Sequence, residues 1–327
     1  MRKRVSVYYD IVGRKAMELM MQSCIRTKQT KRKSKTLSAI THDLGAWMLI
    51  LPFLLFMLFL NWMPTIKGVI WSFFDMQGYT VGKFSGLENY IVVLKNTEFV
   101  KVLWNTIQYV LWSLVLGFWL PIVAAILLNE IKIGRGYFKF AVYFPQMAPA
   151  IAVSMLWYYI YFPNNSGLLN MFLSQFGIEP MQWLQNPKYT IMLIIVSSTW
   201  RGMGGSMLVY LAALQGVNRE LYEAALIDGA GFMKRVLKIT LPQISGIVLL
   251  NFVRQIVAVF QIMEQPLAMT GGGPNGASTS LGLLVYRYAF QNYKVGNALA
   301  LNVVMFLILI VMTIFYFAIK NKVEQDA

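Results

Sequence analysis

Residues 221–242 read LYEAALIDGAGFMKRVLKITLP and connect two long apolar stretches of the chain. Asn218 can cap a short helix here by accepting a backbone N–H bond, and Glu223 complements the positive N-terminal end of that helix. Gly229 lets the chain leave the helix, because glycine adopts backbone conformations closed to other residues. Pro242 lies in the apolar run that follows, where a missing N–H and a ring clash kink a helix. The stretch therefore predicts a short amphipathic helix, a break and a second, bent helix.

The composition argues against a water-soluble domain. Apolar residues make up 57% of the 327 residues, charged residues make up 13%, and mean hydropathy is +0.54, which exceeds what one soluble core requires. A helix that crosses a bilayer needs about 20 mostly apolar residues. Six stretches of residues 41–320 meet that length, at about 44–64, 102–128, 138–162, 189–214, 240–263 and 297–319. We therefore expect an all-α integral membrane protein with six transmembrane helices.

The distribution of basic residues predicts the orientation. If both termini are cytoplasmic, the internal segments 1–40, 129–139, 214–238 and 320–327 carry 20 of the 29 Lys and Arg residues. Cytoplasmic loops of membrane proteins carry an excess of these residues. We therefore expect a multi-pass protein of the cytoplasmic membrane with both termini inside. The net charge of +15 then reflects topology and contact with anionic membrane lipid rather than nucleic acid.

The two ends of the chain, 1–40 and 321–327, are predicted to be cytoplasmic tails. The basic N-terminal tail has two readings that stay open, an interfacial helix within residues 5–25 or a solvated segment that fixes orientation. It is longer than the charged region of a signal peptide, so the first apolar run is interpreted as a retained span. Because Cys24 and His42 are each single, we expect no intramolecular disulfide, no multi-histidine metal site and no catalytic constellation.

The spacing within the quoted stretch carries a resemblance to a known family. The stretch contains Glu223-Ala224-Ala225, followed by three residues, Gly229, nine residues and Ile239-x-Leu241-Pro242. This pattern resembles the EAA loop of binding-protein-dependent ABC importer permeases. The resemblance implies the type I importer permease fold, with a cytoplasmic coupling helix that fits a cleft of a separate ATPase subunit. It implies these coupling residues: Glu223, Ala224, Ala225, Asp228, Gly229, Ala230, Gly231 and Pro242.

Two further segments, FSGLENY at 84–90 and MTGGGP at 269–274, resemble the carbohydrate permeases of the maltose, multiple-sugar and glycerol-phosphate type. The family implies an oligosaccharide substrate, a second homologous permease subunit, two nucleotide-binding ATPase subunits and an extracytoplasmic solute-binding protein. The chain contains no G-x-x-x-x-G-K-S/T motif. By this resemblance the chain is a transport subunit and not an enzyme, it has no cofactor of its own, and ATP and Mg bind to the partner ATPase.

Polar residues within the predicted fourth and fifth spans are candidates for the substrate site, since such residues are costly in a bilayer. An ungapped carry-over from the maltose permease implies contacts at Ser198, Arg201, Gly202, Gly205, Gln255, Ala258 and Val259. The sequence departs from that permease where a leucine becomes Arg201, an aromatic becomes Gly205 and an asparagine becomes Val259. An arginine favours a planar carboxylate through paired N–H bonds. We therefore expect an acidic substrate, such as a uronate-containing oligosaccharide.

Other interpretations stay open beside these. Arg201 could pair with Glu264 or reach a membrane surface, the glycines near it could serve close helix packing, and Arg254 is expected to have a structural role. An ion-driven secondary transporter would also show helical spans and intramembrane charge, but it predicts inverted halves and an ion site. No internal repeat is evident, so the importer permease is the preferred reading.

Overall fold

The computed structural model describes residues 47–325, with side-chain environments up to residue 318. The chain divides into two compact units, residues 1–68 and residues 69–327. The predicted basic tail, residues 1–40, lies outside the described residues, as do Cys24 and His42. Each unit is described by itself below.

The described part of the first unit is helical. It belongs to a 25-residue helix, Trp47–Trp71, with a mean hydropathy of 2.0, which contains a π-helical turn at Leu58–Trp62 and ends as α2, Met63–Trp71. Its side chains are almost all exposed, as a surface that faces lipid would be. The helix covers most of the predicted first span, 44–64.

The second unit begins with a small β-hairpin that the sequence analysis did not predict. Strands β1 (Phe74–Gln77) and β2 (Thr80–Phe84) pair antiparallel, with Met76 opposite Val81. Asn89, in α3 (Glu88–Leu94), holds the hairpin by donating from its amide to the carbonyls of Ser72 and Phe74 at 2.9 Å. The segment FSGLENY thus fixes this end of the unit.

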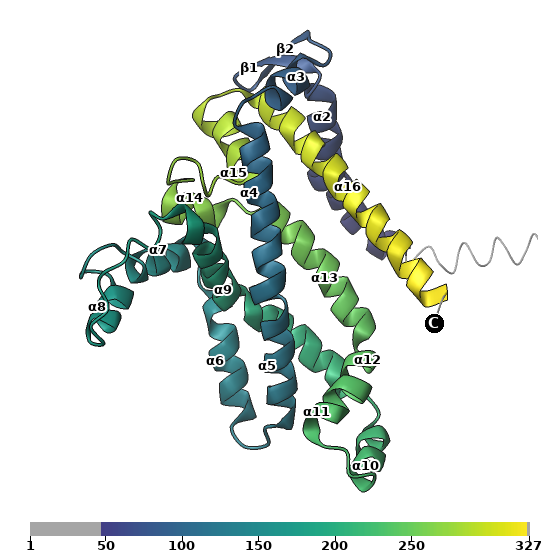
Figure 1. Cartoon of the computed structure of the whole chain (residues 1–327). Helices are drawn as coiled ribbons and strands as arrows, with labels where there is room; N and C mark the ends of the chain where they lie inside the picture. The colour runs from purple at the N-terminus through teal and green to yellow at the C-terminus, as the bar shows by residue number, and fades with distance from the viewer. Residues whose placement is uncertain (1–46, 326–327) are drawn as a thin grey trace, which may run out of the picture. The chain divides into compact units, whose positions relative to one another are not determined.

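Helices make up the rest of the second unit. In chain order they are α4 (Phe99–Trp112), α5 (Trp119–Glu130), α6 (Arg135–Met147), α7 (Ala150–Ile160), α8 (Leu168–Ser174), α9 (Pro187–Gln215), α10 (Arg219–Ile227), α11 (Phe232–Arg235), α12 (Leu241–Gln243), α13 (Ser245–Phe260), α14 (Glu264–Thr270), α15 (Leu281–Tyr286) and α16 (Val295–Gln325). Figure 1 shows the hairpin and α3 at one end of this unit and α10 at the other. We call these the hairpin end and the α10 end.

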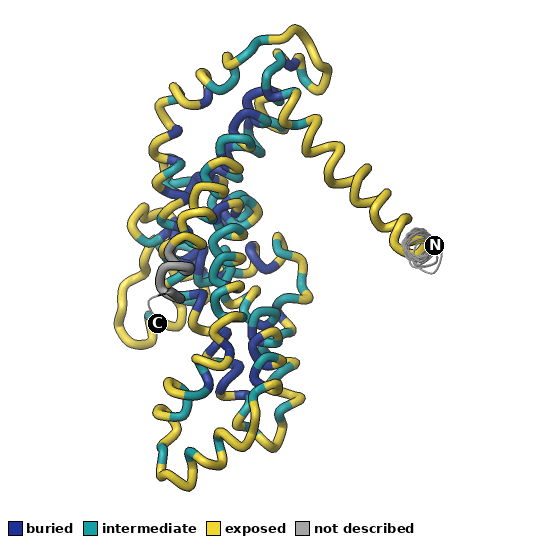
Figure 2. The backbone as a smooth tube through the Cα atoms, turned by 90° about the vertical axis from the view of Figure 1, so that its right-hand side faces the viewer, coloured by how far each residue is buried: buried dark blue, intermediate teal, exposed yellow. Residues whose placement is uncertain are grey.

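Helix α9 lies at the centre of the second unit. It packs against α5 and α6, and also against α4 and α7, and it buries side chains along its length, among them Ile194, Met207 and Tyr210. Figure 2 shows buried residues in the interior of the second unit. Helices α4 and α5 form one continuous helix, Phe99–Glu130, through a π-helical turn at Ser113–Gly117.

The predicted third span, 138–162, is not one straight helix. It is divided into α6 and α7, which meet at an angle of 97°. Ala148 is extended, with φ −76° and ψ 145°, because a proline at position 149 disfavours helical geometry in the residue before it. The predicted fifth span, 240–263, is also bent, by 73° where α12 and α13 meet, two residues after Pro242.

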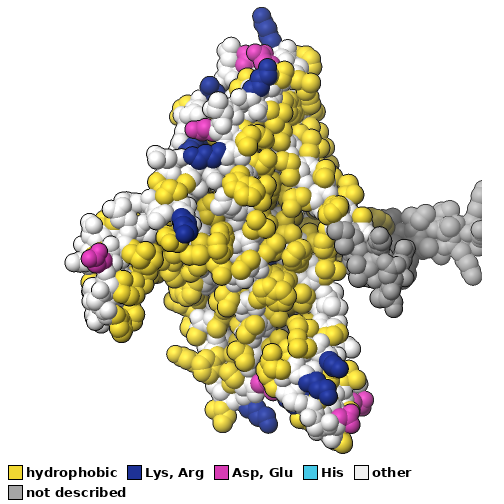
Figure 3. Space-filling view, viewed as in Figure 1, with side chains coloured by type: hydrophobic (Ala, Val, Ile, Leu, Met, Phe, Trp, Pro, Cys, Tyr) yellow, Lys and Arg dark blue, Asp and Glu magenta, His cyan; other side chains and the backbone are white. Residues whose placement is uncertain are grey.

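Within the described residues, three helices are long and apolar enough to cross a membrane, and counting each bent pair as one span gives five. The remaining predicted span, 189–214, corresponds to α9, whose serines, glycines and Arg201 lower its hydropathy. Figure 3 shows a broad hydrophobic surface on one face, with most charged side chains nearer the ends of the second unit. The architecture is that of a helical membrane protein.

Candidate functional site

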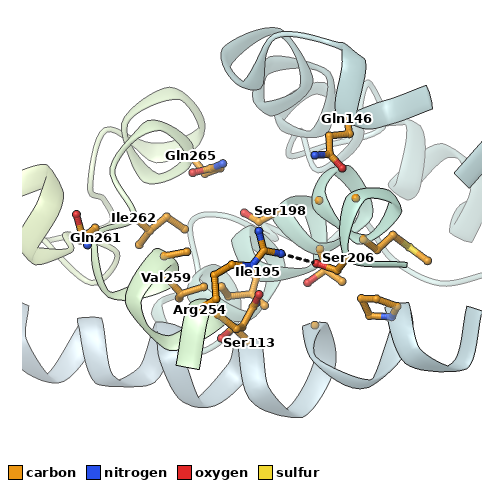
Figure 4. Close-up of a pocket in the computed structure, with 18 of the residues that line it drawn as sticks. Ser113, Gln146, Ile195, Ser198, Ser206, Arg254, Val259, Gln261, Ile262 and Gln265 are labelled. Carbon is orange, nitrogen blue, oxygen red and sulfur yellow. Dashed lines mark hydrogen bonds between the residues drawn. The ribbon is translucent and has the colours of Figure 1, made fainter. Parts of the chain in front are cut away.

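A cavity of about 630 Å³ opens beside α9 and α13. Its walls come from the π-helical turn, α6, α9, α13 and the start of α14. Its polar side chains are Ser113, Gln146, Ser198, Thr199, Ser206, Arg254, Gln255, Gln261, Glu264 and Gln265. Figure 4 shows Arg254, Ser198 and Ser206 near one another, with Gln146 and Gln265 across the space from them. We call this space the main cavity.

The π-helical turn at Ser113–Gly117 brings backbone close to the cavity wall. A Cβ at Gly117 would lie 2.8 Å from the hydroxyl oxygen of Thr199 and 3.4 Å from the amide nitrogen of Gln255. A larger residue would therefore displace the Thr199 side chain where this helix meets α9 and α13. Single π-helical turns inside α-helices are frequent at functional sites, and this one contributes both Ser113 and Gly117 to the main cavity.

The glycines of α9 serve two purposes. A Cβ at Gly204 would lie 2.5 Å from the carbonyl oxygen of Val142 and 2.6 Å from the Cα of Tyr143, so Gly204 allows close packing of α6 on α9. Gly202 faces open space, and Gly205 faces the side chain of Gln146; both line the main cavity. Gly204 therefore serves helix packing, whereas Gly202 and Gly205 leave space for the main cavity.

Six of the seven predicted substrate residues line the main cavity. They are Ser198, Gly202, Gly205, Gln255, Ala258 and Val259. The seventh, Arg201, is absent from the lining, and its Nε donates to the carbonyl oxygen of Ala148 at 3.3 Å. Its guanidinium thereby satisfies a carbonyl at the break between α6 and α7, where the backbone leaves the helix. Arg201 forms no ion pair with Glu264 within the described residues.

Arg254 provides the guanidinium that lines the main cavity. Its Nη2 donates to Ser206 Oγ at 3.1 Å and its Nε donates to Asn251 Oδ1 at 3.2 Å, and neither partner is charged. Sequence reasoning assigned it a structural role. Helical spacing could have placed Arg254 at the cavity, because it lies one helical turn before Ala258 and hence on the same face of α13.

Gln146 is a lining residue that sequence reasoning missed. It lies in the last turn of α6, and its Oε1 is buried without a hydrogen-bond partner among the described residues. A buried acceptor without a partner costs free energy. The residue lies in an apolar run, and its position depends on the packing of α6 against α9, so no local pattern could have identified it.

The predicted coupling helix is α10. The side chain of Asn218 accepts from the backbone N–H of Glu220 at 3.0 Å, which confirms the predicted cap, and Gly229 has φ +68°, which confirms the break. Tyr222 shares a 3.0 Å hydrogen bond with Thr240, and Arg235 donates to the carbonyl of Ala230 at 3.0 Å. These contacts connect α10 to the base of the segment that leads into α13.

Most predicted coupling residues lie on the exposed surface of the α10 end. Exposed are Glu223, Ala224, Asp228, Gly229, Gly231 and Pro242, whereas Ala225 and Ala230 are half-buried. Leu226 is 57% exposed and Ile227 is 87% exposed. Two large apolar side chains of α10 thus lie on the surface.

Comparison with known proteins identifies the family. The model of the binding-protein-dependent transport system inner membrane component matches residues 117–325. The arabinooligosaccharides transport system permease protein AraP of Bacillus subtilis (strain 168) is 32% identical over 282 residues, which cover 85% of this chain and 87% of that protein. The trehalose/maltose transport system permease protein MalF of Thermococcus litoralis is 32% identical over 274 residues, which cover 83% and 91%.

A solved structure shares the fold. A chain of a bacterial ABC transporter involved in the import of the acidic polysaccharide alginate superposes with a TM-score of 0.76 and 24% identity, covering 88% of this chain and 99% of that one. This likeness confirms the predicted importer permease fold. The family match and the relatives confirm the resemblance derived from the EAA loop, and the chain belongs to the binding-protein-dependent transport system inner membrane components, the multi-pass permease subunits of ABC importers.

Proposed function

We propose that this chain forms half of the translocation pathway of an ATP-driven importer of acidic oligosaccharides, and that Arg254 recognises a substrate carboxylate. The observation that carries the proposal is a guanidinium in the wall of the main cavity whose hydrogen bonds go to neutral groups alone. Several relatives are named for sugar transport. The transporter with the shared fold is named for an acidic polysaccharide.

The surroundings of Arg254 suit a carboxylate. Ser206 and Asn251 hold two of the five N–H donors of the guanidinium, and the others remain available for a paired interaction with a carboxylate. Glu264 lines the same cavity from α14, so the negative group of a substrate is expected on the Arg254 side. Gln146, Ser198 and Gln255 supply amide and hydroxyl groups that suit sugar hydroxyls.

The α10 end is proposed to be cytoplasmic and the hairpin end external, in accordance with the predicted charge bias. The exposed surface around Ile227 and Leu226 would then bind one of two separate ATPase subunits, which hold ATP and Mg. A second, homologous permease would complete the pathway. A solute-binding protein would deliver the substrate at the hairpin end; the alginate transporter has been solved with a pentasaccharide-bound periplasmic protein.

The proposed mechanism is alternating access. ATP binding closes the two ATPase subunits, and α10 follows that motion because Tyr222 and Arg235 connect it to the segment that leads into α13. Helix α13 carries Arg254, Gln255 and Val259, so its movement would open or close the main cavity. The energy for this step is the difference in ATP affinity between the inward and outward states. The family match favours this mechanism over the ion-driven alternative.

The test compares two arginines of the same permease. The chain is purified with its neighbouring permease, ATPase and binding protein, reconstituted in proteoliposomes, and assayed for uptake of neutral and uronate oligosaccharides. Arg254→Gln should lower uronate uptake about tenfold or more, because a charge-assisted hydrogen bond contributes about 1.5–3 kcal/mol. Uptake of a neutral oligosaccharide should change little.

Arg201→Gln is the matched control, since it removes the same charge from the adjacent helix outside the main cavity. It should leave the preference between uronate and neutral substrates unchanged. Arg254 does not recognise the carboxylate if Arg254→Gln lowers neutral and uronate uptake equally. The same holds if Arg201→Gln alone abolishes the preference for uronate over neutral substrates. If a loaded binding protein fails to stimulate ATP hydrolysis by the wild-type complex, the importer function itself is wrong.

A further inference from the structure

A second cavity, of about 450 Å³, lies beyond the main cavity, at the C-terminal end of α14. Its walls include Tyr158 from α7, Gln185 from the segment before α9, and Ala268 and Thr270 from α14. The loop after α14 contributes Gly271, Gly273 and Pro274 to its wall. We call this space the outer cavity, and the loop, residues 271–280, the rim loop.

The rim loop is held rigidly by its own hydrogen bonds. Ser278 Oγ donates to the carbonyl of Gly273 and shares a 2.7 Å bond with Thr270 Oγ1, and Arg287 donates to the carbonyl of Gly271. Gly272 has φ +89°, and a Cβ there would lie 2.5 Å from Arg287 Nη2. The wall of the outer cavity is therefore formed before any ligand arrives, which lowers the entropy cost of binding.

Helix α4 holds the rim loop from the other side. Asn105 donates to the carbonyls of Gly276 and Thr279 at 2.9 Å and 3.1 Å, and Tyr109 donates to the carbonyl of Ser278 at 2.9 Å. These bonds are largely buried and join segments about 170 residues apart in the chain. The loop is thus part of the folded core of the second unit.

The opposite wall offers polar groups without partners. Within the described residues, neither the Tyr158 hydroxyl nor the Gln185 amide makes a hydrogen bond, whereas Thr270 Oγ1 is already bonded to Ser278 Oγ at 2.7 Å. The Tyr158 ring packs at 5.6 Å from the ring of Phe162, which fixes its position. None of the described residues that line the outer cavity is charged. A phenol and an amide beside a fixed apolar wall suit a neutral, polyhydroxylated ligand.

The two cavities adjoin the same short helix. Glu264 and Gln265, at the start of α14, line the main cavity, and Ala268 and Thr270, at its end, line the outer one. The rise along an α-helix is about 1.5 Å per residue, so the two sets of lining residues lie within about 10 Å along α14. The outer cavity is therefore close enough to the main cavity for a ligand longer than the main cavity to reach it.

We propose that the outer cavity is a neutral subsite that binds the sugar units of an oligosaccharide extending beyond the main cavity. This inference rests on the proposed function. In the main cavity, Arg254 recognises the charge of the substrate. In the outer cavity, whose described lining residues are uncharged, Tyr158 and Gln185 bind only chains long enough to reach them. Short substrates occupy only the main cavity and gain nothing from the outer one.

The experiment measures uptake into proteoliposomes by the complete transporter with its binding protein, for uronate chains of two units and of five units. Tyr158→Ala combined with Gln185→Ala should lower uptake of the long chain about fivefold at limiting concentration, because two hydrogen bonds to substrate are lost. Uptake of the short chain should stay unchanged. Tyr158→Phe, which keeps the ring and removes only the hydroxyl, should give a smaller loss for the long chain.

Stimulation of ATP hydrolysis by the binding protein loaded with the short chain is the control for folding and docking, and it should be the same in the variants and in the wild type. Equal losses for both chain lengths, or no loss for the long chain, would overturn the subsite. Arg254→Gln provides the contrasting pattern, a loss for uronate chains of both lengths. If the wild-type complex transports neither chain, the failure lies with the proposed function, because then no length comparison exists.

Discussion

The rim loop and the coupling loop, residues 216–231, are both short connections that follow a helix and contain glycines with positive φ, yet the structure holds them in opposite ways. The rim loop receives side-chain hydrogen bonds from Asn105, Tyr109 and Arg287. Within the described residues, the coupling loop has one long-range side-chain bond of this kind, Tyr222 to Thr240, and its large apolar residues Leu221, Leu226 and Ile227 are exposed. The rim loop, which belongs to the core, thus receives side-chain hydrogen bonds from distant helices. The coupling loop, which is proposed to bind a partner, keeps an exposed surface.

The difference has a functional meaning under the proposed mechanism. A coupling helix must follow a partner that moves, so it needs a large free surface and few contacts that fix it from all sides. A loop that forms the wall of a binding cavity must keep its shape, so its polar groups are satisfied within the fold. Three substitutions test this contrast, and their expected effects on stability decrease in the order given.

Gly272→Ala should have the largest effect. The new Cβ would lie 2.5 Å from Arg287 Nη2 and 2.6 Å from Thr279 Oγ1, at a φ of +89°. The strain of that backbone conformation adds to the loss of the Arg287 bonds, and together they should destabilise the second unit by about 3 kcal/mol. The measurement is the unfolding temperature of the purified transporter, followed by tryptophan fluorescence.

Gly229→Ala is the matched control in the coupling loop. Gly229 has φ +68°, and a Cβ there would meet nothing within 4 Å, so only the backbone strain of about 1 kcal/mol remains. A fall in unfolding temperature as large as that of Gly272→Ala would contradict the contrast between the two loops.

Asn105→Ala should have the second largest effect. It removes both amide bonds to the rim loop and leaves the carbonyls of Gly276 and Thr279 without that donor. A buried polar group left unsatisfied costs about 1–3 kcal/mol. Lys101→Met is the control, because its bond to the carbonyl of Asn275 is exposed and water can replace it. Equal unfolding temperatures for the two variants would show that the buried bonds do not hold the loop.

Sequence reasoning predicted the coupling loop more completely than the rim loop. The cap at Asn218 and the break at Gly229 depend on residues adjacent in the chain, and both are confirmed. The glycine cluster at 271–276 predicted a turn, but the donors that hold it come from α4, far away in the sequence. Capping and turn residues can be recognised from local sequence patterns, whereas long-range hydrogen bonds cannot.

The main cavity shows the same limit. The family resemblance implied that Ser198, Gln255 and Val259 contact substrate, and the structure brings them together at one cavity. The break after α6 was missed because hydropathy measures how apolar a run is and not its direction. That break creates the free carbonyl of Ala148 to which Arg201 donates, so the role of Arg201 could not be predicted before the break was known.

Tyr222→Phe should have the smallest effect on stability and a distinct effect on function. It removes the 3.0 Å bond to Thr240, which is half-buried, and one such bond contributes about 1 kcal/mol. The ring still lines the small pocket to which Ile126, Leu214 and Val236 contribute, so the α10 end should remain folded and the ATPase should still bind. If the bond carries motion from α10 toward α13, the variant should hydrolyse ATP at close to the wild-type rate while transporting less substrate per ATP. The ratio of uptake to hydrolysis in proteoliposomes measures this coupling.

A ratio equal to that of the wild type would mean that packing alone connects α10 to the main cavity. Thr240→Val, which removes the other hydroxyl of the same bond, should then leave the ratio unchanged as well.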